Sequence, residues 1–426
     1  MKKKVALTKL SLLVVLCLLL CGKAAAEPVV IGFGNPFATE KQQLVEALIQ
    51  EFNQQHPDIQ VVNLPLGPSS VYDDKLRILF VSGQPPHVVW GTGGNLAAYI
   101  DQGAMVPIDQ FLADDPEMSK DYFLPALIAE LTMPDGRLVG LPFENSNTAL
   151  YYYKDVFDEN ALMYPDLYWE QGRWNWETFA EACKKVTTDR NHDGIPDLFG
   201  FRITTEAYST FMPFLWQNGG QFYNDDFTRS LIDRVEAIEA LEFLADLAHV
   251  SQTALVGGNF ERREVVMMSG VSLDVPSFER LGTVGTSPLP EGVMKATKST
   301  AKAIGISRTT PEEMEAAWTF MKWLLADERF IEHWLIPAGY LPVTPSGIGY
   351  PAYVDYITQH PLIHAFIRQV DYAFNTPILP HPDLAHRELD EVLKQVLLRR
   401  EVSPAEGLRE LARVVNSRIE QYWQQQ

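Results

Sequence analysis

The stretch VVIGFG (residues 29–34) decides how the rest of the chain is interpreted. It is a short apolar run closed by glycine and an Asn-Pro pair, which predicts a buried strand. A helix is expected next, because Leu44, Leu48 and Phe52 repeat every four residues. A second apolar run at 59–64 predicts another strand directly after it.

The same alternation continues along the chain. We expect a helix at 71–81, a strand at 87–90 and a helix at 95–102 that ends at Gly103. Strands that alternate with helices favour a largely parallel sheet with helices on both faces. The sequence therefore predicts the α/β class.

The central and C-terminal parts are interpreted in the same way. An extended crossing segment is expected at 138–143, before an apolar strand at 149–153, and two prolines favour a return crossing near 286–290. Helix starts are marked by Asn175 and by a capping box at 403–406. The remaining expected elements are helices at 211–216, 234–247 and 311–323 and a strand at 303–307.

The N-terminus predicts export. Residues 1–4 are basic, residues 10–20 are almost wholly apolar, and three alanines precede Glu27, which together are typical of a signal peptide spanning 1–26. A periplasmic location follows. Cys21 offers an alternative, a lipid anchor, but the large Leu20 before it favours cleavage after Ala26.

Composition narrows the classes of partner. The formal charge is −20, and the predicted signal peptide holds five lysines and no acid, so the processed chain is more acidic still. Such a surface disfavours nucleic acid as a partner. Cys183 would be the one cysteine left, and its helical spacing with Phe179 and Val186 predicts a buried thiol without a catalytic role.

Several further segments carry a resemblance to a known family when taken together with the first strand and helix. They are PHVVW at 86–90, GAMVPID at 103–109, GLPF at 140–143 running on to LYYYKD at 150–155, WNWE at 174–177, NGG at 218–220, AIGIS at 303–307 and GYLPVT at 339–344. In this order, behind a signal peptide, the chain resembles the family 1 extracellular solute-binding proteins of ATP-driven (ABC) importers. It departs from the family at Tyr153, where an asparagine is common, and at His87, where an aspartate is common.

The resemblance implies a two-lobed periplasmic binding protein fold of the type II kind. Each lobe would be a mainly parallel sheet flanked by helices, and crossing strands would hinge the lobes so that they close over a ligand. We expect lobe I at 27–140 plus 295–345 and lobe II at 141–294 plus 346–426. The implied role is capture of a sugar and its delivery to ABC permease subunits. The protein would act as a monomer and would not be an enzyme.

A sugar presents apolar ring faces and a rim of hydroxyls, so its site needs aromatic rings beside amide or carboxylate groups. The resemblance places strand ends and crossings along the cleft. The predicted ligand-binding residues are Trp90, Asn145, Asn147, Trp216, Asp274 and Tyr340. Each could instead be a packing or turn residue.

One loop has the spacing of a calcium site. Asp189, Asn191, Asp193 and Asp197 occupy its first, third, fifth and ninth positions, and Gly194 the sixth. The twelfth position lacks the usual glutamate, which favours an Asx-rich turn over a metal site. Structural calcium is the one possible cofactor; none is required for function.

Three alternatives remain open. The turn around Tyr340 is similar to that of glycerol-3-phosphate-binding members, but residues 375–380 lack the arginine found in those members, although Arg387 lies nearby. A secreted glycoside-active enzyme would need two carboxylates about 5 to 10 Å apart, for which Glu144 and Asp274 are the candidates. The third alternative is a ligand-sensing partner of a receptor kinase.

Overall fold

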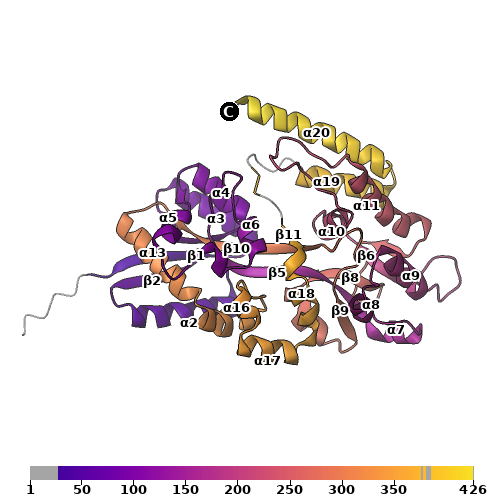
Figure 1. Cartoon of the computed structure of the whole chain (residues 1–426), viewed down its shortest axis with the longest axis horizontal. Coiled ribbons are helices and arrows are strands. Elements are labelled where there is room, and N and C mark those ends of the chain that lie inside the picture. Colours follow the sequence, from indigo (N-terminus) through magenta and orange to yellow (C-terminus); the bar gives the residue numbers. More distant parts are fainter. Residues whose placement is uncertain (1–26, 376–377, 380–384, 426) are drawn as a thin grey trace, which may run out of the picture. The chain divides into compact units, whose positions relative to one another are not determined.

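The computed structural model describes residues 27–375, 378–379 and 385–425 (Figure 1). The predicted signal peptide and Cys21 lie outside these residues. The described residues divide into two compact units, unit 1 (within 27–88 and 309–323) and unit 2 (within 89–308 and 324–425). Among the described residues, no helix combines the length and apolarity needed to cross a membrane. The lobe boundaries expected from the sequence stay a prediction.

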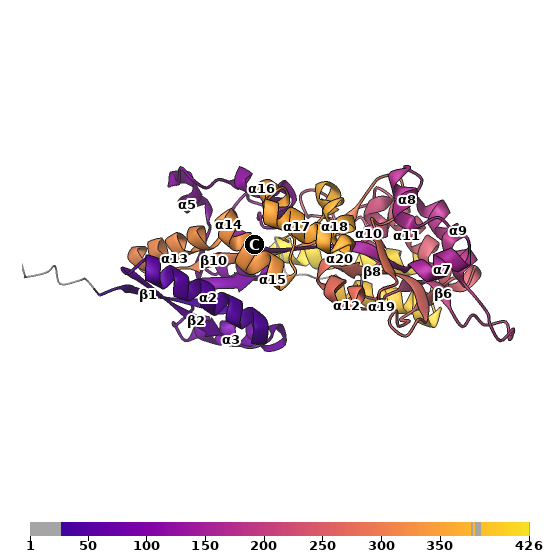
Figure 2. The same cartoon turned by 90° about the horizontal axis from the view of Figure 1, so that it is seen from below.

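Unit 1 confirms the alternating strands and helices expected at the N-terminus. Val29 lies opposite Ile59 in a parallel pair of strands. Phe320 packs against Phe33 and Phe52, with ring centroids 5.9 and 5.1 Å away, so two helices cover one face of the first strand (Figure 2). The elements are β1 (Val29–Asn35), α2 (Thr39–Gln55), β2 (Ile59–Pro65), α3 (Ser69–Val81) and α13 (Pro311–Leu324).

Unit 2 contains a mixed sheet in the order β3-β10-β5-β8-β6-β7, with β4 and β11 paired to β10 and β9 paired to β5. The pairs β6–β7 and β6–β8 are parallel, whereas β5 is antiparallel to β8, β9 and β10. The strands are β3 (Val88–Gly91), β4 (Met105–Val106), β5 (Leu141–Tyr153), β6 (Phe199–Ile203), β7 (Ala254–Val256), β8 (Val265–Val271), β9 (Val284–Ser287), β10 (Thr297–Ser307) and β11 (Ala373–Phe374).

Strands β5 and β10 differ from their expected bounds. The crossing segment and the strand after it form one continuous strand, every residue of which is buried. The return strand β10 begins at Thr297 and not at 303, and the segment expected to return, 286–290, instead holds the end of the short β9. Residues 297–302 are polar at most positions, which hid a strand that has neighbours on both edges. The pairing of β5 with β10 shifts between Lys302 and Ala303, at a β-bulge.

The helices of unit 2 pack around this sheet. α18 lies against β5, while α6 and α10 lie against β10. The α-helices are α4 (Gly93–Asp101), α5 (Asp109–Asp114), α6 (Pro125–Glu130), α7 (Lys154–Glu159), α8 (Pro165–Glu170), α9 (Trp176–Val186), α10 (Phe211–Gln217), α11 (Val235–Ala245), α12 (Val275–Glu279), α14 (Asp327–Phe330), α15 (Ile336–Ala338), α16 (Pro345–Ile348), α17 (Pro351–Gln359), α18 (His364–Ile367), α19 (His386–Leu393) and α20 (Pro404–Gln425). Short 3₁₀ or π segments are η1 (Lys120–Tyr122), η2 (Asp246–Val250), η3 (Ser272–Asp274), η4 (Ile331–Leu335), η5 (Pro361–Ile363), η6 (Val370–Tyr372) and η7 (Lys394–Arg399).

Local signals in the sequence set several helix ends. The Asn175 side chain caps α9 by accepting the Thr178 N–H at 3.0 Å. Ser403 and Glu406 bond each other's backbone N–H groups and confirm the capping box of α20. Cys183 is fully buried in α9, and burial raises the pKa of its thiol, as expected for a packing residue.

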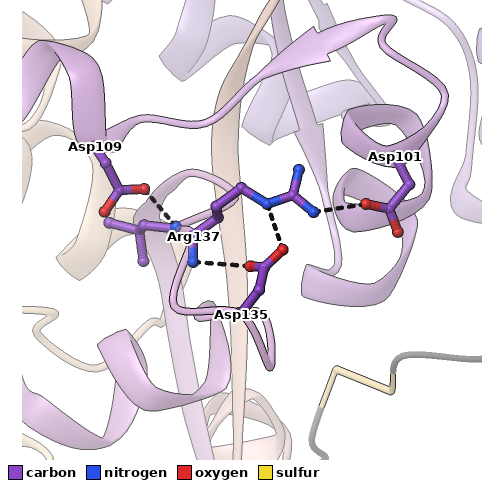
Figure 3. A network of polar contacts seen from close by, with 5 residues as sticks. Asp101, Asp109, Asp135 and Arg137 are labelled. Atoms are coloured by element: carbon purple, nitrogen blue, oxygen red, sulfur yellow. Dashed lines mark hydrogen bonds and ion pairs between the residues drawn. The ribbon is translucent and has the colours of Figure 1, made fainter.

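A polar network fixes the turn that leads into β5 (Figure 3). Arg137 donates from Nε to Asp135 at 2.6 Å and from Nη2 to Asp101 at 2.8 Å. The next residue, Leu138, donates its backbone N–H to Asp109 at 2.6 Å. Three carboxylates on separate segments therefore hold the approach to β5 in place.

Candidate ligand-binding face

Alternation along β10 produces a polar sheet face inside unit 2. Lys298, Thr300 and Lys302 are half-buried, whereas the residues between them are buried. Across the antiparallel pair, Thr300 lies opposite Ser146 and Lys302 opposite Glu144. Directly opposed residues share a face of the sheet. We call these five residues the β10 face: Glu144, Ser146, Lys298, Thr300 and Lys302.

Two predicted residues meet at one end of the β10 face. Trp90 lies on β3, next to β10, and its Nε1 donates to Glu144 Oε1 at 3.1 Å. The Lys302 ammonium lies 5.6 Å from the centroid of the Trp90 ring. Burial, and then the hydrogen-bonded Glu144 carboxylate, raise the pKa of Tyr340. The Glu144 carboxylate thus connects two aromatic side chains from separate elements.

Trp216 lies at the other end. Its ring stacks on Phe374 at 5.4 Å between centroids. Phe374 pairs with Lys298 in the β10–β11 register, which places the stacked rings at the Lys298 end of the face. The Tyr208 ring lies 5.4 Å from the Lys298 ammonium and completes an aromatic group there.

Asn145 and Asn147 lie on the opposite face of the sheet. In β5 they alternate with Glu144 and Ser146, so their side chains point the other way. Asn145 donates to the carbonyl of Pro342, and Asn147 to that of Phe366, both at 2.7 Å. Both amides therefore connect β5 to neighbouring segments, and we do not include them in the β10 face.

Asp274 belongs to a turn at the end of β8. Its Oδ2 accepts the Val271 N–H at 3.2 Å, and burial raises the pKa of this carboxyl. The Tyr151 hydroxyl donates to the Val271 carbonyl at 2.8 Å. The bonding of Asp274 is that of a turn residue, and a ligand contact at this position stays a prediction.

Glu130 lies buried at the end of α6, beside β10. Its Oε2 accepts the backbone N–H of Ala301 at 2.8 Å. Burial raises the pKa of Glu130 to about 8, against the opposing effects of this hydrogen bond and of the Lys302 and Lys298 charges. The carboxyl is therefore mostly protonated at pH 7.

The β10 face combines ring faces with hydroxyl, ammonium and carboxylate groups. Lys298 and Lys302 are about 13 Å apart along the strand, at roughly 3.3 Å per residue. An aromatic group stands at each end of this span, and two hydroxyls lie between. Such a surface can stack against apolar ring faces and bond a row of hydroxyls.

Sequence reasoning missed the residues that β10 supplies. The signal was present in TKSTAK (297–302), where every second residue is a threonine, serine or alanine that could be buried. Period-two alternation in a polar stretch is easily read as a loop, and here it marks a half-buried strand.

The comparisons with known proteins can now be set beside this geometry. A family model described as bacterial extracellular solute-binding protein matches residues 47–354. The chain belongs to this family. In sequence, this solute-binding protein is 22% identical over 369 residues to a maltotriose-binding protein of Pyrococcus abyssi, covering 83% of the chain and 75% of the relative.

A second relative has a different ligand. The chain is 26% identical over 288 residues to the sn-glycerol-3-phosphate-binding periplasmic protein UgpB of Rhizobium meliloti. The match covers 62% of this chain and 64% of that relative, slightly less than two thirds of its length. Sugar-binding and glycerol-phosphate-binding proteins are thus both among the relatives.

Solved structures agree with the fold of this solute-binding protein. The cyclic alpha-maltosyl-1,6-maltose binding protein of Arthrobacter globiformis superposes with a TM-score of 0.80 at 21% identity, over 92% of this chain and 100% of that one. UgpB of Mycobacterium tuberculosis, in complex with glycerophosphocholine, gives a TM-score of 0.74 at 16% identity, over 93% and 99%. These likenesses confirm the periplasmic binding protein fold.

In the calcium-like loop of this solute-binding protein, the carboxylates accept hydrogen bonds from backbone N–H groups of the same loop. Asp189 accepts the N–H groups of His192 and Gly194, at 2.7 and 2.9 Å. Asp197 accepts that of Arg190 at 2.7 Å, and Asp193 that of Ile195 at 2.8 Å. No group of three or more His, Cys, Asp or Glu within the described part of the chain is arranged to hold a metal ion. The preference for an Asx-rich turn over calcium binding by Asp189, Asn191, Asp193 and Asp197 stays a prediction.

We expect the melting temperature of the parent to be the same in excess calcium and in chelator, because the loop oxygens already accept backbone N–H groups. In the double variant Asp189→Ala/Asp193→Ala the free energy of unfolding should fall by about 1 kcal/mol, equally in both buffers, because these hydrogen bonds are lost. Differential scanning calorimetry measures both effects. A calcium-dependent rise in the parent that the variant lacks would instead establish a metal site.

Proposed function

We propose that this chain captures a sugar or oligosaccharide in the periplasm and delivers it to the permease subunits of an ABC importer. The observation that carries the proposal is the β10 face, where Trp90 and Trp216 stand at opposite ends of a row of polar side chains. The membership in a solute-binding family and the likeness to a maltotriose-binding protein support it.

We propose binding without turnover. A glycoside-cleaving site needs two carboxyl groups placed about 5 to 10 Å apart on either side of one bond. Here Glu144 accepts a hydrogen bond from Trp90, and Asp274 accepts the Val271 N–H in a turn at the end of another strand. The bonding of neither carboxylate suggests an acid and base pair.

Glycerol 3-phosphate or a related polyol phosphate is the second candidate ligand. It is supported by the UgpB relatives and by the Lys298 ammonium at one end of the β10 face. Phosphate sites need a committed cation, and Lys298 is the residue of this face that could serve as one.

Isothermal titration calorimetry on the purified mature chain tests the proposal. The panel is glucose, maltose, maltotriose and sn-glycerol 3-phosphate, and we expect at least one member to bind with a Kd in the micromolar range or below. The same samples, analysed after overnight incubation, should show no cleavage of maltose or maltotriose. Absence of binding across this panel and a wider set of sugars would contradict the proposal. Cleavage of maltose or maltotriose would instead support a glycoside-active enzyme.

The resemblance also predicts that the lobes close over the ligand. Small-angle scattering should then show a lower radius of gyration when a saturating ligand is added. An unchanged profile would contradict closure.

A further inference from the structure

Lys298 is the basic residue of the β10 face whose charge lacks a close counter-charge. Its side chain is half-buried, on the same face as Thr300, and its ammonium lies over the Tyr208 ring, 5.4 Å from the centroid. Among the residues that the structure describes, Lys298 makes no hydrogen bond and no ion pair. The chain has 55 acidic and 35 basic residues, so a partly buried lysine without a carboxylate partner is unexpected here.

The two carboxyl groups that act on Lys298 through their charge do so from a distance. Glu130 already accepts the Ala301 N–H and, with a pKa of about 8, is mostly neutral at pH 7. Glu206 is exposed, where solvent screens it, and its Oε2 accepts a hydrogen bond from Ser209 at 3.2 Å. Neither carboxyl group comes within the 4 Å of an ion pair with Lys298.

The two rings beside Lys298 do not supply negative charge. Burial lowers the pKa of His386. The Lys298 charge lowers this pKa further and the Asp390 charge raises it, and the lowered pKa favours the neutral imidazole at pH 7. The Tyr208 ring attracts the ammonium through its π face. Burial lowers the pKa of Lys298 itself, which means that the charged ammonium is under-solvated as it stands.

Lys302 shows the contrasting case on the same strand. Its ammonium lies over the Trp90 ring, and the residue lies directly opposite Glu144. The Glu144 carboxylate in turn accepts a hydrogen bond from Trp90. The two ends of the β10 face are therefore unlike in charge: the Trp90 end carries both signs, and the Trp216 end is positive.

We propose that Lys298 binds an oxyanion, a carboxylate or a phosphate, carried by the hydroxyl-rich ligand that the β10 face holds. The inference rests on the proposed function and narrows its ligand class to acidic sugars or polyol phosphates. The anionic group would lie at the Lys298 end, beside Trp216 and Phe374, while the hydroxyls lie along Thr300 and Ser146. A charge-assisted hydrogen bond there offsets the cost of burying the ammonium.

Calorimetry with matched ligand pairs tests the inference. Galactose is compared with galacturonate, glucose with glucose 6-phosphate, and glycerol with sn-glycerol 3-phosphate. We expect the acid of at least one pair to bind at least tenfold more tightly than its neutral partner, since hydrogen bonds to charged groups are worth roughly tenfold to a hundredfold in Kd. The pair that shows the difference identifies the carboxylate or the phosphate as the group recognised.

Substitutions at Lys298 separate its charge from its bulk. Lys298→Met should weaken binding of the acid at least tenfold, and by more than it weakens binding of the neutral partner, whereas Lys298→Arg should restore most of the acid affinity. The matched control is Lys295→Met, because Lys295 is exposed, lies outside β10 and has its ammonium 4.9 Å from the Trp169 ring. This control should leave every Kd unchanged.

The outcomes are distinguishable. Neutral ligands that bind at least as tightly as their acids, or acid binding that survives Lys298→Met in a variant with the parent's melting temperature, would overturn the oxyanion site and leave the proposed function standing. Absence of binding by acids and neutral ligands alike would overturn both.

Discussion

Replacing Trp90 by alanine should weaken binding of the preferred ligand by roughly thirtyfold, equivalent to about 2 kcal/mol. The Trp90 ring closes one end of the β10 face, and its Nε1 is a donor to the buried Glu144. The alanine variant loses the stacking surface and leaves the carboxylate with one partner fewer. Trp90→Phe keeps an aromatic ring but loses the donor and part of the stacking area, so we expect a smaller effect, less than about fivefold.

Calorimetric titration measures both constants, and circular dichroism verifies the folding of each variant. Trp423→Ala is the matched control: this tryptophan is 45% exposed on the C-terminal helix α20, and its loss should not alter binding. A folded Trp90→Ala variant with the Kd of the parent would show that Trp90 is only a packing residue.

Glu130→Gln should change how stability depends on pH. The folded-state pKa of Glu130 is raised from 4.5 to about 8 because the carboxyl is buried. Between these values the folded chain keeps a proton that the unfolded chain releases, so the contribution of Glu130 is fully present below pH 4.5 and is lost as the pH rises to 8. The glutamine variant does not lose this stability. The difference in the free energy of unfolding between the variant and the parent should therefore grow, in favour of the variant, by roughly 3 to 5 kcal/mol from pH 4.5 to pH 8.

Guanidinium chloride titrations at pH 5, 6.5 and 8 measure the free energy of unfolding of the parent and the variant. The glutamine carbonyl can still accept the Ala301 N–H, so the variant changes the charge and keeps the hydrogen bond. The control Glu117→Gln alters an exposed side chain and should follow the parent at every pH. If the free energy of unfolding changed with pH equally in the parent and in Glu130→Gln, Glu130 would be ionised in the folded state.

Much of the fold could be predicted because its signals are local. The strand β1, the repeat of Leu48 and Phe52 in α2, the Asn175 cap and the capping box at Ser403 each depend on neighbours in the sequence. The family resemblance supplied the rest of the architecture. The start of β10 could not be predicted, because its polar residues read as a loop until the strands on either side are known.

The site was less accessible to prediction. The family resemblance pointed to Trp90 after a strand and to Trp216 before the glycine pair 219–220, and the structure places both around the β10 face. The faces of Asn145 and Asn147 depended on the pairing of β5 with β10, which no local pattern states. Lys298 was missed for the same reason, because its significance arises from Tyr208 and Phe374, which come from distant parts of the chain.

The alternation of β10 also bears on how such a protein could change its specificity. Lys298, Thr300 and Lys302 are half-buried on the polar face of the strand, while Ser299 and Ala301 are buried on its other face. Successive codons therefore encode a residue of the polar face and a residue of the buried face in turn. Selection for a ligand would then act on the codons for residues 298, 300 and 302, and selection for folding on those for 299 and 301.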